Sequence, residues 1–118
     1  MKNIFIADDD AAIVDATSMM LELMGYQIKS TLKGSEVLTA MESVPDLLLL
    51  DIWLSGVDGR DICKQLKSDP KTKNLPILMI SASREIKASA LASGADDFLA
   101  KPFDMQSLLK KIENLVSQ

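Results

Sequence analysis

Short apolar runs recur along the chain, and stretches with helical spacing separate them. Runs such as "LLLL" and "ILMI" are continuously apolar rather than alternating, which is typical of strands in the middle of a sheet that is covered on both faces. The five strands predicted in this way comprise residues 3–7, 26–31, 46–50, 76–80 and 97–100.

The first and last intervening stretches have the clearest helical pattern. The first predicts a helix whose buried stripe comprises Ile13, Thr17, Met20, Leu21 and Met24. Gly25 is expected to end this helix, as glycine commonly does. The last helix is expected to begin with Asp104 as its N-cap. Its stripe comprises Leu108, Leu109, Ile112, Leu115 and Val116.

The three middle helices are predicted more weakly. The apolar positions of the second and third helices are Val37, Leu38 and Met41 after Gly34, and Ile62, Cys63 and Leu66 after Gly59. The fourth helix, in "KASALASG", offers little apolar area, so we expect it to be among the more mobile elements.

Strands and helices thus alternate five times within 118 residues. This order predicts one α/β domain, (βα)5, with a doubly wound five-stranded parallel sheet and helices on both faces. A chain of this length is large enough for a single core and too short for a second one to be expected.

Polar residues follow four of the five predicted strands. They are Asp8 and Asp9 after the first strand, Asp51 after the third, Ser81 after the fourth and Lys101 after the fifth. In an open doubly wound sheet, ligands bind outside the carboxyl ends of the strands. The sequence therefore predicts that three carboxylates, a hydroxyl and an ammonium meet at one edge.

Each of these residues also has an ordinary structural explanation. One of the aspartates at 8–10 could cap the first helix, Asp51 could be a turn residue, Ser81 could cap the fourth helix and Lys101 could be a solvated lysine. One helix needs only one cap, however, and these explanations leave the shared edge as a coincidence. We therefore favour a common site.

Such a cluster requires a cation. Two carboxylates about 4 Å apart repel each other by roughly 4 kcal/mol at an effective dielectric constant of about 20, and Lys101 alone cannot balance three. The chain contains no histidine, so histidine-based catalysis is excluded and any metal must be held by oxygen atoms. An all-oxygen site favours Mg²⁺ far more than Zn²⁺.

Asp51 directly follows a run of four leucines, where an unpaired carboxylate would be costly. A carboxylate beside Mg²⁺, a lysine and a hydroxyl donor is arranged to attack a phosphoryl group in line. We therefore predict that Asp51 is a nucleophile that accepts phosphate.

Composition narrows the setting further. The formal net charge is −4 and there is no basic run, so direct binding of nucleic acid by this domain is not expected. The one cysteine, Cys63, cannot form an internal disulfide and is expected to be a core residue. No apolar stretch is long enough to span a membrane and no signal peptide is recognisable, so we expect a cytoplasmic protein.

At these positions the chain resembles, along its whole length, the receiver domain of two-component response regulators. "IADDD" is similar to the acidic pair of that family, "LLLLDIWLSGVDG" to its phosphoacceptor strand and loop, "ILMISA" to the Ser/Thr-Ala end of its fourth strand and "DFLAKPF" to its Lys-Pro motif. Four motifs in the family order and spacing make the resemblance specific. It implies one receiver domain over residues 1–118 with the flavodoxin-like strand order 2-1-3-4-5.

Carried over residue by residue, the resemblance implies that Asp51 becomes an aspartyl phosphate and also binds Mg²⁺. Asp9 would bind the metal directly and Asp8 mainly through water, with the backbone carbonyl of Trp53 as a further ligand. Asp8 and Asp9 immediately follow the strand, which leaves Asp10 as the expected N-cap.

The resemblance also implies a switch. Ser81 and Lys101 would bind phosphoryl oxygens, and the Lys101–Pro102 peptide bond would be cis. Ser81 would swing toward the phosphoryl group while Phe98 takes an inward rotamer, which changes the surface of the fourth helix, fifth strand and fifth helix. Phe98 could also be an ordinary core aromatic residue.

The partners follow from the same resemblance. The phosphodonor would be a histidine kinase or a histidine phosphotransfer protein, and the switching surface would bind a downstream protein, with the chain a monomer or a phosphorylation-dependent dimer. It would catalyse only its own phosphotransfer and slow dephosphorylation. Because Met1 directly precedes the first strand and Gln118 directly follows the last helix, we expect either a stand-alone regulator or the N-terminal part of a longer one.

Two residues depart from the family pattern. Ser55 stands where the family commonly has proline, which we expect to loosen the loop modestly. Trp53 is large for the position two residues after the phosphoacceptor, and we expect it to shield the acyl phosphate from water.

Two other functions share part of this pattern. A haloacid-dehalogenase-like phosphatase also ends an apolar strand with a nucleophilic aspartate, but its motif places a second acid where this chain has Trp53. A flavodoxin-like or degenerate receiver module would only dock partners, and the complete set of polar residues at the sheet edge argues against it.

Overall fold

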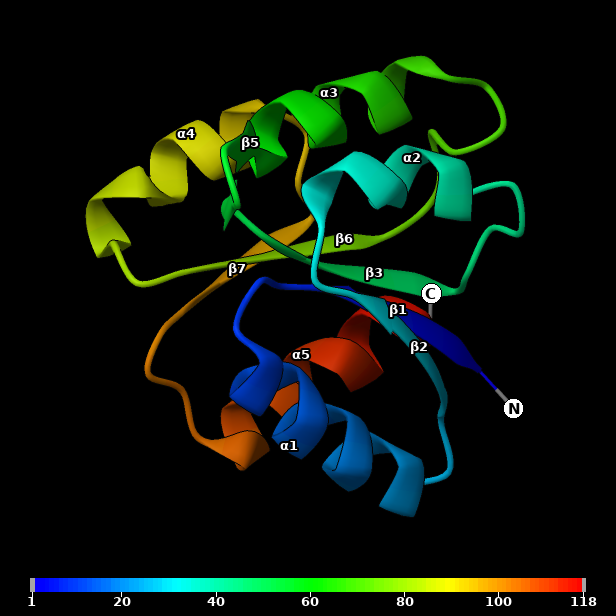
Figure 1. Ribbon diagram of the computed structural model, residues 1–118, viewed down its shortest axis with the longest axis vertical. Helices are drawn as coiled ribbons and strands as arrows, with labels where there is room; N and C mark the ends of the chain where they lie inside the picture. The colour runs from blue at the N-terminus through cyan, green and yellow to red at the C-terminus, as the bar shows by residue number, and fades with distance from the viewer. Residues whose placement is uncertain (1, 118) are drawn as a thin grey trace.

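The computed structural model describes residues 2–117 and shows a parallel sheet between two layers of helices (Figure 1). The sheet contains β1 (Asn3–Ala7), β2 (Gln27–Thr31), β3 (Leu47–Asp51), β6 (Ile77–Ser81) and β7 (Asp97–Ala100). Their spatial order is β2-β1-β3-β6-β7, and every pairing is parallel. The predicted doubly wound fold and its strand order are confirmed, with strand bounds that differ by at most one residue.

Helices cover both faces of this sheet (Figure 1). One face carries α1 (Ala11–Leu23) and α5 (Met105–Val116), and the other carries α2 (Val37–Ala40), α3 (Gly59–Ser68) and α4 (Lys87–Ala92). The short helices α2 and α4 each continue from a 3₁₀ turn, η1 (Gly34–Glu36) and η2 (Arg84–Ile86). Within residues 2–117, no helix combines the length and the apolar character that crossing a membrane requires.

The leucine run of β3 packs against both layers of helices. Leu48 and Leu50 pack into the core cluster on the side of α2, α3 and α4, whereas Leu47 and Leu49 pack beneath α1 and α5. All four are at most 1% exposed. Successive side chains of a strand point to opposite faces, so a strand between two helical layers needs no polar position.

The stripe predicted for α1 is partly wrong. Thr17 and Leu21 are buried as expected, but the third buried position is Val14, while Met20 and Met24 are 39% and 54% exposed. Val14, Thr17 and Leu21 follow the 3–4 spacing of one helical face. The two methionines lie on the flank of that face and meet solvent.

The other predicted stripes are confirmed, except that Leu38 is exposed and that Leu109 and Val116 are only partly buried. The buried positions are Val37, Met41, Ile62, Cys63, Leu66, Leu108, Ile112 and Leu115. The predicted N-caps are also confirmed, because Asp10 accepts backbone N–H groups at the start of α1 and Asp104 accepts that of Ser107 at the start of α5.

A small ribbon after β3 was not predicted. The strands β4 (Trp53–Leu54) and β5 (Val57–Asp58) pair antiparallel, and each has only two residues, too few to show any periodicity. The ribbon leads directly into α3, whose N-cap is Asp58.

Candidate functional site

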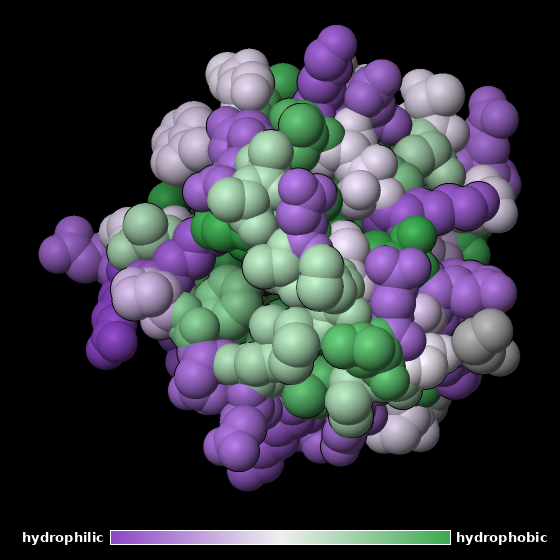
Figure 2. Space-filling model, turned by 60° about the horizontal axis from the view of Figure 1, so that its bottom comes forward, coloured by the Kyte–Doolittle hydropathy of each residue, from purple (hydrophilic) through white to green (hydrophobic). Residues whose placement is uncertain are grey.

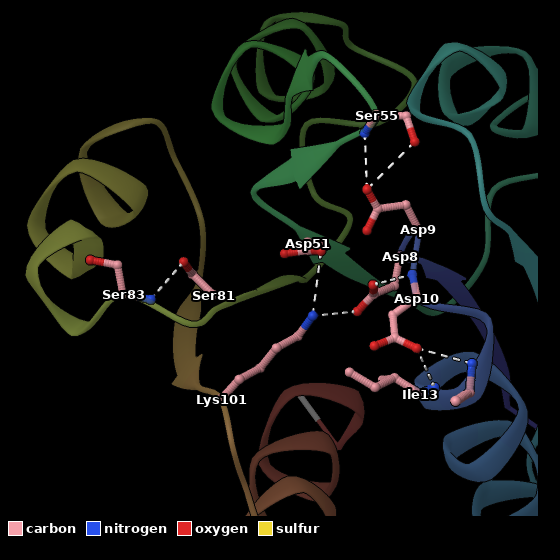
Figure 3. Close-up of polar contacts among 10 residues, drawn as sticks. Asp8, Asp9, Asp10, Ile13, Asp51, Ser55, Ser81, Ser83 and Lys101 are labelled. Carbon is pink, nitrogen blue, oxygen red and sulfur yellow. Dashed lines mark hydrogen bonds and ion pairs between the residues drawn. The ribbon is translucent and has the colours of Figure 1, made fainter.

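The ends of three strands bring Asp8, Asp51 and Lys101 together (Figure 3). Asp8 follows β1, Lys101 follows β7, and Asp51 is the last residue of β3. The ammonium of Lys101 lies 2.8 Å from Asp8 Oδ2 and 3.4 Å from Asp51 Oδ2. We had placed Asp51 and Ser81 just beyond their strands, but both remain in the sheet, where their backbones still align with Ile80 and Ala100 of neighbouring strands.

Asp9 completes an acidic cluster with Asp8 and Asp51. One carboxylate oxygen from each of the three residues lies within 4.8 Å of the other two. Asp8 and Asp51 are buried, being 3% and 8% exposed, whereas Asp9 is exposed. Three carboxylates facing one ammonium leave a deficit of positive charge, and hard oxygen donors at this spacing are the set that Mg²⁺ uses. The residues present therefore fit the predicted ion.

Burial decides the protonation of Asp51. Its pKa is raised to about 6, chiefly by removal from water, then by the negative charge of Asp8, while Lys101 works in the opposite direction. Burial by itself would lower the pKa of Lys101, but its hydrogen bond to Asp8 and the charges of both carboxylates raise it overall. The lysine is thus a permanent cation, and Asp51 is mostly ionised at neutral pH.

Asp9 is held from the opposite side by Ser55 (Figure 3). The Ser55 N–H donates to Asp9 Oδ2 at 3.1 Å, and its hydroxyl makes a longer contact of 3.5 Å with the same oxygen. Ser55 has a positive φ of 49° and is followed by Gly56 with φ of 87°. This bond anchors the loop at Asp9, and a proline could not make it because proline has no N–H to donate; the looser loop expected from the absence of proline stays a prediction.

Ser81 and Phe98 do not touch the carboxylates. The Ser81 hydroxyl accepts the Ser83 N–H at 3.1 Å and lies apart from Asp51 (Figure 3). Phe98 is 6% exposed and packs in the core cluster on the side of α2, α3 and α4. Phe98 is thus buried in the core, and its change of rotamer together with a movement of Ser81 stays a prediction. The Lys101–Pro102 peptide bond is cis, as expected.

A family model described as the response regulator receiver domain matches residues 4–113 of this chain. The chain belongs to the response regulator receiver family. It is therefore a phosphorylatable signalling module of two-component systems rather than a conventional enzyme, and its acidic cluster is the phosphorylation site characteristic of such domains.

Known proteins agree with this assignment. The "DNA-binding dual master transcriptional regulator RpaA" of Synechocystis sp. is 40% identical over 119 residues, which cover 98% of this chain and 49% of that protein. The "Phosphate regulon transcriptional regulatory protein PhoB" of Rhizobium meliloti is 34% identical over 98% of this chain and 52% of that protein. The chain thus spans about half the length of these curated relatives.

A solved structure matches almost end to end. The crystal structure of a putative response regulator from Chloroflexus aurantiacus superimposes with a TM-score of 0.94 at 33% identity. The match covers 99% of this chain and 98% of that one, which confirms the receiver fold independently of the curated relatives.

Two features of this receiver were not visible in its sequence pattern. Gly59 lies so close to the end of β3 that a Cβ there would overlap the backbone oxygen of Asp51, and its N–H donates to Ile52 O at 2.6 Å. Trp53 is 57% exposed, with the guanidinium carbon of Arg60 5.6 Å from its ring centroid. Asp58 before a predicted helix could have suggested a cap, but nothing linked Arg60 to Trp53. The role of the Trp53 carbonyl as a metal ligand remains a prediction.

Proposed function

We propose that Asp51 is the phosphoacceptor of this receiver domain and takes its phosphoryl group from a histidine kinase or a histidine phosphotransfer protein. The observation that supports this proposal most strongly is the position of Asp51. It is buried at the end of β3, lies 3.4 Å from the Lys101 ammonium and clusters with Asp8 and Asp9. With a pKa of about 6 its carboxylate is available as a nucleophile at neutral pH.

Mg²⁺ would be held by Asp8, Asp9, Asp51 and the backbone carbonyl of Trp53, where it supplies positive charge opposite the phosphoryl oxygens. In the transfer, a bond forms between a carboxylate oxygen of Asp51 and phosphorus, while the phosphorus–nitrogen bond breaks and the donor imidazole keeps the electron pair. Lys101 binds a second phosphoryl oxygen from the opposite side, because Asp8 already tethers its ammonium next to Asp51.

Ser81 completes the proposed set by offering its hydroxyl to the phosphoryl group. To do so it exchanges its present bond from the Ser83 N–H for one to a phosphoryl oxygen. This exchange, together with a response of Phe98, is the proposed switch that alters the surface of α4, β7 and α5 for a downstream protein target.

The surface beside Lys101 suits the approach of the donor. A cavity of about 390 Å³ next to this lysine is lined by apolar side chains that include Ile13, Pro102, Phe103 and Met105. Figure 2 brings the side of α1 and α5 forward and shows apolar residues gathered on it. Because this cavity opens beside Lys101, which lies 3.4 Å from Asp51, we propose that it receives part of the phosphodonor.

The wider setting is also proposed. We take residues 1–118 as one receiver domain that acts in the cytoplasm, as a monomer or as a dimer formed on phosphorylation. RpaA is named as a DNA-binding regulator, but with a net charge of −4 and no basic run this domain itself is not proposed to bind nucleic acid.

Intact mass after incubation with Mg²⁺ and a small acyl-phosphate donor tests the proposal. The native chain is expected to gain one phosphoryl group, whereas Asp51→Asn and a metal-free control gain none. A native chain that binds Mg²⁺ without gaining mass would favour the module that only docks partners.

A further inference from the structure

Arg60 contacts three elements of the molecule: the start of α3, the β4–β5 ribbon that follows Asp51, and α4. Its Nε and Nη2 donate to the two carboxylate oxygens of Asp58 at 2.9 and 2.7 Å. Its Nη1 donates to the hydroxyl of Ser89 at 2.8 Å. Its guanidinium also lies 5.6 Å from the ring centroid of Trp53. Asp58 caps α3, Ser89 belongs to α4, and Trp53 comes two residues after Asp51.

These contacts fix the guanidinium in one orientation. Trp53 and Asp58 are paired across the β4–β5 ribbon, so the two-pronged ion pair with Asp58 also sets the place of Arg60 relative to the indole. The planar fork then leaves Nη1 free to reach α4. The side chains of Arg60 and Asp58 are only 24% and 22% exposed, so water screens the attraction between them only in part.

Apart from the hydrogen bond between Arg60 and Ser89, α4 is only weakly attached to α3. Its six residues are mainly alanine and serine, and Ala90 is its buried residue. A groove of about 260 Å³, lined in part by Lys64 and Ser93, lies between α3 and α4. Among the described residues, no side-chain hydrogen bond other than Arg60–Ser89 joins these two helices. The stability of α4 should therefore depend strongly on this one contact.

We propose that Arg60 is a positioning residue that transmits the state of the acidic cluster to α4. A change at Asp51 shifts the following loop and Trp53, and Arg60, held between the indole and Asp58, carries that shift to Ser89. Because this role rests on the proposed phosphorylation of Asp51, it adds to that function a route to α4 that does not pass through Ser81 or Phe98.

Two variants cut the route at different points. Ser89→Ala removes the hydroxyl at the α4 end and leaves Arg60, Asp58 and Trp53 in contact. Arg60→Lys keeps the positive charge, but a single ammonium cannot hold Asp58 and Ser89 with the geometry of the guanidinium fork. The matched control is Lys64→Ala, since Lys64 lines the same groove and its ammonium makes no hydrogen bond or ion pair with any described residue.

The test uses the full chain with Mg²⁺ and a small acyl-phosphate donor, and intact mass measures the phosphorylated fraction. Trp53 is the only tryptophan, so its emission reports on the loop, while amide hydrogen exchange of residues 87–92 reports on α4. In the native chain and in Lys64→Ala, phosphorylation is expected to change both signals. In Ser89→Ala the emission change should persist, while α4 exchanges about fivefold faster before phosphorylation and loses at least half of its response. In Arg60→Lys, the changes that phosphorylation causes in Trp53 emission and in the exchange of α4 should both differ from those of the native chain.

The outcomes separate this role from the proposed function. A native chain that is phosphorylated while Ser89→Ala responds in α4 as fully as the native chain does would overturn the role of Arg60 alone. A phosphorylated native chain without any response in α4 would overturn it as well. No gain of mass in the native chain would overturn the phosphoacceptor itself, and the role of Arg60 with it.

Discussion

Lys101 is bound more closely by Asp8, at 2.8 Å, than by the proposed phosphoacceptor Asp51, at 3.4 Å. Asp8 thus holds the ammonium in place, while Asp51 keeps only one long contact to it. This division leaves the nucleophile available without leaving a buried charge unpaired. It also makes Lys101 a structural residue as well as a reactive one.

Replacing Lys101 by methionine should therefore cost stability as well as phosphorylation. Without the ammonium, Asp8 and Asp51 face each other in a buried site, and we expect a loss of about 2 to 3 kcal/mol in the free energy of unfolding at pH 7 without metal. Urea denaturation measures this. The control is Lys111→Met, because the Lys111–Asp97 pair is about one-third exposed and should contribute about 1 kcal/mol or less. Equal losses in the two variants would contradict the account.

Asp51 should make the metal-free protein less stable as the pH rises from about 4 to about 6. Its pKa is about 6 in the folded chain and about 3.9 in an unfolded one. Between these values the folded state keeps a proton that the unfolded state has lost, so ionisation favours unfolding. The stability that this proton provides is fully present below about pH 4 and is lost as the pH rises through about 6, by roughly 3 kcal/mol in total.

Asp51→Asn removes this dependence and should be the more stable chain at pH 7 in the presence of a chelator. Urea denaturation of both chains between pH 4 and pH 7 gives the difference, and groups such as Asp58, whose pKa is lowered by Arg60, cancel because both chains contain them. The account fails on this point if the two stability curves run parallel.

The loop at Ser55 offers a test of how Asp9 is positioned. Ser55→Pro removes the N–H that Asp9 accepts and cannot adopt the positive φ of 49°, so we expect a loss of about 2 to 3 kcal/mol and weaker Mg²⁺ binding. Ser55→Gly keeps the N–H and tolerates the backbone angle, and it should stay close to the native chain in both respects. Mg²⁺ titration followed by the emission of Trp53 distinguishes them. Equal affinities would show that the bond to Asp9 is unimportant.

Trp53 is expected to protect the phosphorylated chain from hydrolysis. Its exposed indole is held by Arg60 two residues beyond Asp51, whereas an asparagine at this position could orient a water molecule. Trp53→Asn should therefore shorten the lifetime of the phosphorylated form, by about tenfold if one water is brought into position. Decay is followed by intact mass after removal of the donor, and a rate that is unchanged or slower would dispose of the proposed shielding.

The meeting of Asp8, Asp51 and Lys101 was predictable because parallel strands share an edge at their carboxyl ends, whatever the details of packing. The buried face of α1 was harder to predict, because Val14 and Met20 are both apolar. Only the orientation of the helix on the sheet decides that Val14 is buried and Met20 exposed. A spacing pattern contains no such direction.

The contacts of Ser55 and Arg60 were even harder to predict from the sequence. The bond from Ser55 to Asp9 uses a backbone N–H, which every residue except proline has and which no side-chain pattern reveals. Arg60 meets Trp53 and Ser89 only because the β4–β5 ribbon, α3 and α4 converge in three dimensions. Such contacts between separate elements have no local signal in the sequence.

The most direct test of the central claim locates the phosphoryl group. After phosphorylation with Mg²⁺ and a small acyl-phosphate donor, borohydride reduces an aspartyl phosphate to homoserine, and peptide mapping by mass spectrometry identifies the altered residue. The account predicts homoserine at position 51 alone, and none when Mg²⁺ is withheld. Homoserine at Asp8, Asp9 or Asp58, with position 51 unaltered, would contradict it.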